Sequence, residues 1–449
     1  MSSSVVGGVR KRVLIVGGGF AGLKAAAALA DAEVNVTLID RRNHHVFQPL
    51  LYQVALAMLA PSEIAQPIRA MVHAPNTEVL MDEVVGFDTA AQRANLKSGT
   101  TLEYDYLVLA TGSTHSYFGR DDWAELAPGL KTIEDAVEIR RRVLLAFELA
   151  EGQMLESGKH PALNFVIVGG GPTGVELAGA ISDIAKLYIA KDFKHIDSSK
   201  AEVVILEGSP VILAAYPKPL QESAVKQLND LGVTVHVNTR VTDIQPGYVM
   251  VGDQRIDSVV TLWAAGVQAS PLGKLLGVEC DKKGSVIVDD HLHPAGHPEI
   301  FVCGDLAHAI SDGKAVPGVA QPAMQMGDYA GKAIALEVKG GRMNKPFHYW
   351  DKGDMATIGR SAAIANVKWP FTAMLSGFPA WAAWLAVHIF FLIGFRNRIS
   401  VFRSWAFTYL FFKEGARLIT GAVTLPGWGV EDKPRGVYTT RPISAPQEP

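Results

Sequence analysis

The sequence predicts an α/β protein with two domains built from βαβ units, followed by a C-terminal helical region. A β-branched apolar run that enters a glycine turn and then an Ala/Leu-rich helix occurs twice, near residues 13 and 165. The chain changes character after about residue 345, where aromatic residues become frequent. A chain of 449 residues is longer than a single domain with one hydrophobic core usually is. The formal net charge of −3 gives the protein no overall positive charge for binding the phosphate backbone of a nucleic acid. We therefore expect several domains and no nucleic-acid partner.

The first glycine turn has the spacing of a Rossmann-like dinucleotide site. Its glycines are Gly17, Gly19 and Gly22, and Asp40 ends the next apolar run, 23 residues after Gly17. Glycines let the backbone turn sharply and approach a pyrophosphate, whose charge then lies at a helix N-terminus. An acid at this distance accepts hydrogen bonds from a ribose diol. This segment therefore predicts a first dinucleotide-binding domain.

The second turn repeats the pattern with Gly169, Gly171 and Gly174. Its acid, Glu207, lies 38 residues after Gly169, and the excess fits a polar insertion at about residues 187–200. A carboxylate at this place binds a 2′-hydroxyl and repels a 2′-phosphate. We therefore expect NADH rather than NADPH at this second site.

Two further glycine turns complete the order of motifs. Thr111 and Gly112 follow a strand between the two copies, and Gly304 and Asp305 follow a strand after them. This order resembles the flavoprotein superfamily with two dinucleotide-binding domains in a glutathione-reductase-like arrangement. The resemblance implies that the first site, with these four residues, binds FAD. It also implies an FAD-binding domain over 11–124 and 266–345, interrupted by an NADH-binding domain over 125–265.

The cysteines exclude part of that superfamily. Cys280 and Cys303 are the only two, and none precedes residue 280, so the redox-active cysteines of disulfide reductases and related peroxidases are missing. Their spacing fits no metal site, and we expect no metal.

Two longer motifs are more specific. The segments His45-Val46-Phe47-Gln48-Pro49-Leu50-Leu51-Tyr52-Gln53-Val54-Ala55 and Ala320-Gln321-Pro322-Ala323-Met324-Gln325 resemble the signatures of type II NADH dehydrogenases, over about residues 11–425. These are single-subunit respiratory enzymes that pass electrons from NADH through FAD to a membrane quinone without pumping protons.

The resemblance also suggests catalytic residues. Gln321 and Gln325 are expected to line the quinone pocket and to donate hydrogen bonds to a quinone carbonyl, since a spacing of four puts both amides on one helix face. Gln325 has the alternative of bracing the helix against the flavin domain. Glu176, two residues after Gly174, is expected at the nicotinamide, with the alternative of an acid favourably placed at a helix N-terminus.

The C-terminal segment, about 346–425, is expected to lie on the membrane. Residues 369–395 contain no charged side chain, but Pro370 and Pro379 leave only about 16 residues for a helix, which is short for spanning a bilayer. A spanning helix and a buried core helix stay alternatives. Aromatic rings and nearby basic residues favour an interfacial position, and the members of this group are Trp381, Trp384, Trp405, Arg396, Arg398 and Arg403.

Further expectations concern partners and location. The alternative for some of these rings is a homodimer contact instead of a membrane contact, and a homodimer is expected. Residues 1–12 carry no apolar signal segment, so we expect a peripheral protein on the cytoplasmic side of the cell membrane, and residues 426–449 form a flexible tail. The functional alternatives are an NAD(P)H-dependent reductase of a soluble acceptor such as ferredoxin, and a flavin-binding redox sensor.

Overall fold

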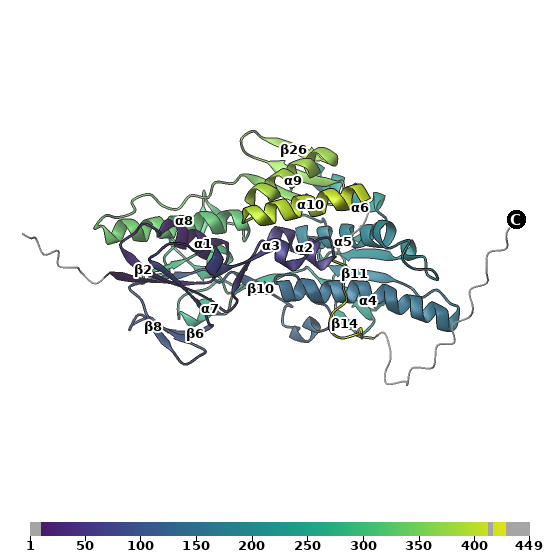
Figure 1. Cartoon of the computed structure of the whole chain (residues 1–449), viewed down its shortest axis with the longest axis horizontal. Coiled ribbons are helices and arrows are strands. Elements are labelled where there is room, and N and C mark those ends of the chain that lie inside the picture. Colours follow the sequence, from purple (N-terminus) through teal and green to yellow (C-terminus); the bar gives the residue numbers. More distant parts are fainter. Residues whose placement is uncertain (1–9, 412–415, 428–449) are drawn as a thin grey trace, which may run out of the picture.

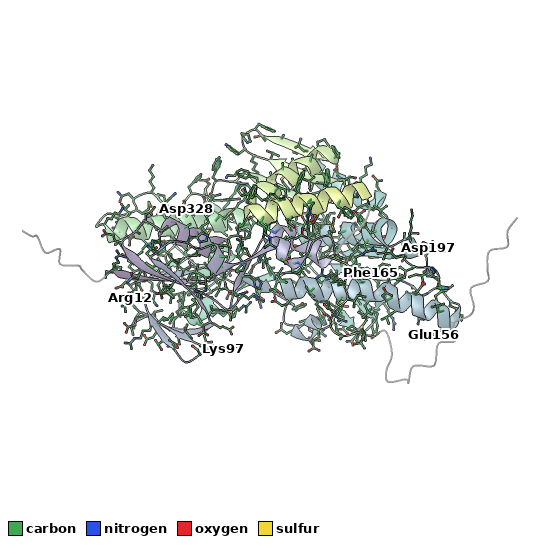
Figure 2. All side chains as sticks on the ribbon, in the orientation of Figure 1. Arg12, Lys97, Glu156, Phe165, Asp197 and Asp328 are labelled. Carbon is green, nitrogen blue, oxygen red and sulfur yellow. The ribbon has the colours of Figure 1, made fainter. Side chains whose placement is uncertain are left out.

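The computed structural model describes residues 10–411 and 416–427. Two α/β halves lie side by side along the long axis, and the C-terminal helices α9 (Phe378–Phe391) and α10 (Phe395–Phe411) cover one side of the molecule (Figure 1). Charged side chains such as Arg12 and Lys97 lie at the rim, whereas Phe165 lies inside one half (Figure 2). The tail expected at 426–449 lies almost wholly outside the described residues.

The first half contains a five-stranded parallel sheet in the order β20-β9-β1-β2-β5. The strands β1, β9 and β20 are largely buried, as their near-continuous apolar sequences require, whereas the edge strand β5 is partly exposed. Two helices, α1 (Phe20–Ala28) and α8 (Ala320–Val338), pack so closely that a Cβ at position 327 would overlap the Ala21 carbonyl. Glycine at position 327 permits this packing. The strand bounds are Lys11–Val16 for β1, Val34–Asp40 for β2, Thr77–Met81 for β5, Tyr106–Leu109 for β9 and Ile300–Val302 for β20.

The second half repeats this design with a four-stranded parallel sheet in the order β13-β12-β11-β17. The excess length before Glu207 forms a π-helical turn at Ile184–Tyr188 and a short 3-10 turn at Ser198–Lys200. The bounds are Asn164–Val168 for β11, Glu202–Leu206 for β12, Val233–His236 for β13, Val260–Trp263 for β17, Ile133–Ser157 for α4, Pro172–Asp183 for α5 and Lys218–Asp230 for α6.

The chain passes between the halves through two paired strands. Strand β10 (Ser113–His115) leaves the first half, and β18 (Val267–Ala269) returns to it in antiparallel register. The second sheet is therefore an insertion between β9 and β20 of the first, which places the carboxyl ends of both sheets near one crossing point.

A three-stranded antiparallel sheet that the sequence did not lead us to expect precedes the two C-terminal helices. It consists of β24 (Gly353–Thr357), β25 (Ala363–Val367) and β26 (Ala373–Ser376). Small residues let this sheet pack closely against α9, because Ala363 and Ala365 are fully buried under Ala380 of that helix. The uncharged segment at 369–395 thus begins in a sheet and only then becomes helical.

Two of the rings assigned to the membrane are core residues instead. Trp384 and Trp405 are 1% and 4% exposed, and they lie 5.8 Å apart, with Tyr52 against Trp384. Their assignment to the membrane was wrong because α9 has two faces, and Trp384 points inward while Phe390 points outward. Within the described residues, no helix combines the length and apolarity that crossing a bilayer requires.

The last described segment, 416–427, runs over the second half. Arg140 and Arg141 of α4 donate hydrogen bonds to the carbonyls of Ala416, Ala422 and Thr424. Leu425 is buried beneath this crossing. The end of the range expected at the membrane therefore contacts α4.

Candidate active site

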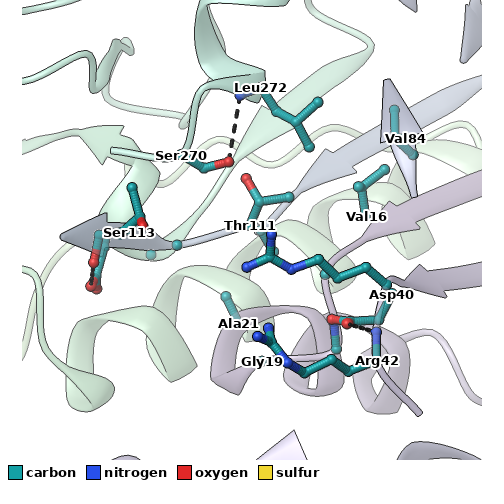
Figure 3. Close-up of a pocket in the computed structure, with 18 of the residues that line it drawn as sticks. Val16, Gly19, Ala21, Asp40, Arg42, Val84, Thr111, Ser113, Ser270 and Leu272 are labelled. Atoms are coloured by element: carbon teal, nitrogen blue, oxygen red, sulfur yellow. Dashed lines mark hydrogen bonds between the residues drawn. The ribbon is translucent and has the colours of Figure 1, made fainter. Parts of the chain in front are cut away.

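A cavity of about 590 Å³ opens at the carboxyl ends of the first sheet (Figure 3). It runs from the first glycine turn and Asp40, past Thr111 and Ser113, to Gly304 and Asp305. Seven of the eight residues predicted for FAD line this cavity, and the eighth, Gly22, packs behind the turn against the Gly17 carbonyl. Its length along the sheet edge suits an extended dinucleotide.

The three glycines of the first turn have separate functions. Gly17 has a φ of +108° and lies against the Ala110 carbonyl, so a Cβ would overlap that carbonyl. A Cβ on Gly22 would overlap the carbonyl of Gly17, which sets the close packing of helix and turn. A Cβ on Gly19 meets nothing within 4 Å, so this glycine leaves the helix N-terminus open to a ligand.

Asp40 is held at the end of β2 by two backbone groups. Its Oδ2 accepts from the Gly18 N–H at 2.7 Å, and its Oδ1 accepts from the Arg42 N–H at 2.7 Å. Each oxygen keeps a further lone pair for a ribose hydroxyl. The carboxylate is therefore oriented before a ligand binds.

The other end of the cavity carries polar groups suited to a sugar-phosphate chain. Thr111 has a buried Oγ1 without a hydrogen-bond partner among the described residues, and Gly112 and Gly304 have positive φ values of 65° and 72°. Asp305 accepts from Ser113 Oγ at 2.6 Å, so one carboxylate oxygen remains for a ligand hydroxyl. These residues fit the ribityl and phosphate region of FAD.

Two residues of this region were missed. Lys131 donates to Ser113 Oγ at 3.0 Å, and its Nζ lies 3.8 Å from Asp305 Oδ2. Ser113 follows the Thr-Gly turn directly, so its position gave a usable signal. No signal in the sequence indicated Lys131, because Ser113 and Asp305 are 18 and 174 positions away from it along the chain. Only the fold brings the three side chains together.

The second turn reproduces the first in detail. Gly169 has a φ of +109° and lies against Ala264, Gly174 packs on the Gly169 carbonyl, and Gly171 is open. Glu207 accepts from the Gly170 N–H at 2.6 Å and from the Ser209 N–H at 2.7 Å. The four residues predicted for NADH therefore form one site, with Glu207 in the place that Asp40 has in the first.

Glu176 lies in the first turns of α5 and is partly buried. Burial raises the pKa of its carboxyl to about 8, although a backbone hydrogen bond from Thr357 opposes this rise. Burial together with the charges of Asp354 and Glu176 also raises the pKa of the Tyr216 phenol far above its usual value. Glu176 is thus a carboxyl group with a raised pKa in the first turns of α5, the helix that follows the second glycine turn.

The two glutamines of α8 contact the loop before β24. Gln325 donates to the Trp350 carbonyl at 3.0 Å and accepts from the Trp350 N–H at 2.9 Å, so it braces this loop. Gln321 donates to the Gly353 carbonyl at 2.9 Å, which leaves its buried Oε1 without a partner in the described part of the chain. Each of these bonds uses one of the two N–H groups of the amide, so each glutamine keeps a second N–H, and the expected contact with a quinone carbonyl stays a prediction.

Comparison with known proteins agrees with this geometry. Residues 11–327 match the family model described as pyridine nucleotide-disulphide oxidoreductase, and residues 351–414 match the NDH2 C-terminal domain. The fold and the two glycine–acid sites define a flavoprotein with two dinucleotide-binding domains.

The chain is 42% identical to type II NADH:quinone oxidoreductase NdhA of Mycobacterium tuberculosis over 93% of this chain and 91% of that protein. It is 30% identical to the type II NADH:quinone oxidoreductase of Haemophilus influenzae over 80% and 87% of the two chains. The chain therefore belongs to the family of type II NADH:quinone oxidoreductases.

Solved structures share the fold at low identity. NDH2 from Plasmodium falciparum in complex with NADH superposes with a TM-score of 0.78 at 18% identity, over 92% of this chain and 100% of that one. The sulfide:quinone oxidoreductase of Aquifex aeolicus gives a TM-score of 0.69 at 18% identity, over 89% and 95%.

Family membership confirms the fold class, the enzyme class and the cofactors that the sequence predicts. The protein is an oxidoreductase that uses FAD and NADH and transfers electrons from NADH to a quinone without pumping protons. A reductase of a soluble acceptor and a redox sensor were the alternatives, and the relatives named above do not support them.

Proposed function

We propose that FAD and NADH bind at the two glycine–acid sites as assigned above, and that the quinone is reduced beside the N-terminus of α8 at a membrane surface. The observation that carries this proposal is the duplicated geometry, in which Asp40 and Glu207 are held by equivalent backbone N–H groups. The proposed division is an FAD domain over 11–124 and 266–345, an NADH domain over 125–265 and a membrane region over 346–425.

FAD, when bound, supplies the redox chemistry, because it accepts a hydride and returns the electrons to an acceptor. The residues of the chain supply binding and orientation. Gly17, Gly19 and Gly22 admit the pyrophosphate, Asp40 orders the adenosine ribose, and Thr111, Gly112, Gly304 and Asp305 hold the remaining polar chain.

Glu207 makes the second site selective for NADH. Its carboxylate is fixed by two N–H groups and faces the place of the adenosine ribose. A 2′-phosphate there would meet a fixed negative charge, and like charges in contact cost several kcal/mol. Gly169, Gly171 and Gly174 admit the pyrophosphate of NADH in the same way as the first turn.

Glu176 is proposed as the acid at the nicotinamide. With a pKa of about 8, the carboxyl is mostly protonated near neutral pH. A neutral acid at this position donates a hydrogen bond or a proton and adds no charge beside the ring. This property distinguishes it from an ordinary surface acid at a helix N-terminus.

Gln321 is proposed as a quinone-pocket residue that works through its free oxygen. Because its Nε2 is held by Gly353, its buried Oε1 is available as an acceptor. A quinol hydroxyl donates to such an oxygen, and the second N–H of the amide can donate to a carbonyl of the oxidised quinone. Gln325 keeps the loop at Trp350 in place and contributes to the pocket by position.

The outer face of the C-terminal region is proposed to lie on the cytoplasmic side of the membrane. Its exposed apolar side chains are Trp369, Phe371, Met374, Phe378, Val387, Phe390, Phe391, Phe395, Ile399, Phe402 and Phe407. Arg396, Arg398 and Arg403 accompany them, and no acidic residue occurs between 369 and 411. Large exposed rings beside cations suit an anionic bilayer surface.

A homodimer is a separate proposal. Sedimentation of the detergent-solubilised protein tests it, because a dimer requires twice the mass of one chain. A single-chain mass at all concentrations contradicts it.

Steady-state oxidation of NADH by the FAD-loaded full chain tests the proposed function. We expect turnover with menaquinone or ubiquinone analogues in lipid vesicles, and at least ~10-fold lower efficiency with NADPH. Turnover with ferredoxin and none with either quinone contradicts the proposal.

A further inference from the structure

Four buried polar side chains connect α10 with the acid of the second site. The indole Nε1 of Trp405 donates to Gln53 Oε1 at 2.7 Å, and Gln53 Nε2 donates to the Tyr52 hydroxyl at 3.0 Å. The Tyr52 hydroxyl lies 2.9 Å from Thr357 Oγ1. Thr357 completes the series, because β24 packs against α5 and the Thr357 backbone interacts with the Glu176 carboxyl.

The direction of these hydrogen bonds follows from the donor at one end. An indole N–H only donates, so it fixes the oxygen of Gln53 toward Trp405 and the amide nitrogen toward Tyr52. The phenol oxygen of Tyr52 then accepts from Gln53, and either hydroxyl can be the donor in the bond between Tyr52 and Thr357 Oγ1.

The series joins three parts of the fold. Tyr52 and Gln53 belong to α2 (Leu51–Ala55) of the first half, Thr357 ends β24, and Trp405 lies in α10. All four side chains are at most 6% exposed. Glu63 strengthens the same junction, since its Oε1 accepts from Ser400 Oγ at 2.8 Å and from Ser404 Oγ at 2.6 Å.

We propose that Tyr52 and Thr357 are positioning residues for Glu176, holding the Thr357 N–H against its carboxyl and thereby controlling when this acid carries a proton. The proposal rests on the proposed role of Glu176. Trp405 and Gln53 extend this control to α10, the helix whose outer face carries Phe395 and Phe402. The membrane-facing helix and the nicotinamide-side acid are thus parts of one hydrogen-bonded unit.

The physical basis is the competition between burial and one hydrogen bond. Burial favours the neutral carboxyl, whereas the N–H of Thr357 favours the carboxylate. Without the Tyr52 hydroxyl, Thr357 loses its side-chain anchor, and the N–H bond weakens. The pKa of Glu176 then rises further. Tyr216 lies close to this acid and to Asp354, and neither Tyr216 nor Asp354 is changed in the variants described next.

The test is the rate of flavin reduction by NADH in the anaerobic FAD-loaded full chain, measured against pH. Wild type is expected to show an inflection near pH 8. Tyr52→Phe and Thr357→Val are expected to move it upward by about 0.5–1 pH unit. Thr357→Ser keeps the hydroxyl and is expected to leave it in place.

A matched control uses another buried phenol. Tyr117 donates to the Ala127 carbonyl at 2.9 Å in a separate part of the core, so Tyr117→Phe removes a comparable hydrogen bond without touching this unit. Its inflection is expected to coincide with wild type. The infrared carboxyl band of Glu176, isolated as wild type minus Glu176→Gln, gives a second readout that needs no turnover.

The outcomes separate this inference from the proposed function. If Glu176→Gln abolishes the inflection while Tyr52→Phe and Thr357→Val keep the wild-type value, the positioning proposal is wrong and the role of Glu176 stands. The same conclusion follows if these variants only lower the melting temperature. If Glu176→Gln keeps the wild-type profile, the role of Glu176 is wrong, and the inference fails with it.

Discussion

The Glu207 carboxylate accepts a hydrogen bond of 2.6 Å from the backbone N–H of Gly170, the residue between the first two glycines of the second turn. Asp40 and Gly18 make the same contact at 2.7 Å in the first turn. Under the proposed assignment, this contact connects the acid that would bind the ribose to the loop that would hold the pyrophosphate. The proposal therefore links nucleotide selectivity and binding at each site through one hydrogen bond.

Replacing Glu207 by Gln is expected to reduce the preference for NADH over NADPH by at least ~10-fold, because the fixed negative charge disappears while one hydrogen-bonding oxygen remains. The ratio of kcat/KM for the two nucleotides measures this change. Glu202→Gln, an exposed acid at the start of β12, serves as the control and should keep the ratio. An unchanged ratio in Glu207→Gln would remove this residue from the nucleotide site.

The stability of the protein is expected to depend on pH through Glu176. Its pKa rises from 4.5 to about 8 on folding, so the folded chain binds more protons, and stability is lost as the pH rises from about 4.5 towards 8. The neutral side chain of Glu176→Gln removes this loss. The variant is expected to gain about 2–4 °C in melting temperature relative to wild type between pH 5 and pH 8.5, the size of ~1 kcal/mol in a large domain.

The control for this melting experiment is Glu156→Gln, which alters an exposed acid near the end of α4. Its difference from wild type should not change between the two pH values. A pH-independent difference for Glu176→Gln as well would show that the acid is not buried as described.

Replacing Gln321 by Leu is expected to slow quinone reduction by roughly 10-fold, since one hydrogen bond to a reacting oxygen contributes about 1–1.5 kcal/mol. Reduction of the flavin by NADH should keep its wild-type rate, because Gln321 belongs to α8 of the first half, whereas the residues proposed for NADH belong to the second half. Separate stopped-flow measurement of the two half-reactions distinguishes these effects. Equal slowing of both would indicate a general disturbance of the flavin domain.

Replacing Phe390 and Phe402 by Ser is expected to weaken binding to anionic vesicles by at least ~10-fold for each ring, since a buried aromatic side chain contributes about 1.5–3 kcal/mol. Both rings are more than 60% exposed in the outer face. Vesicle flotation measures the bound fraction. Leu155→Ser alters an apolar residue of α4 that is 54% exposed, and this control should bind like wild type. If all variants bind alike, this face is not the membrane surface.

The glycine turns and their acids were predictable because the backbone requires them. A φ near +108° at Gly17 and a carbonyl against Gly22 leave no room for other residues, so the sequence spacing carries the geometry. The extra length before Glu207 is an insertion in the connection between β11 and β12. These two strands still pair in register, so the insertion leaves the geometry of the turn and its acid unchanged.

The parts that escaped prediction depend on contacts between distant segments. Tyr52 and Thr357 are 305 residues apart, and no local pattern indicates that their hydroxyls meet. The inward position of Trp384 was missed because α9 is apolar on both faces, so periodicity does not distinguish the core face from the outer one. The β24–β26 sheet was not predicted because its strands contain many small residues, which have a low preference for strands.

The most direct test of the account follows the flavin colour of the full chain without oxygen. NADH is expected to bleach the bound FAD, and a menaquinone or ubiquinone analogue in vesicles is expected to restore the colour, with one quinone reduced per NADH oxidised. Bleaching that persists with both quinones and reverses only with a soluble acceptor such as ferredoxin would contradict the account.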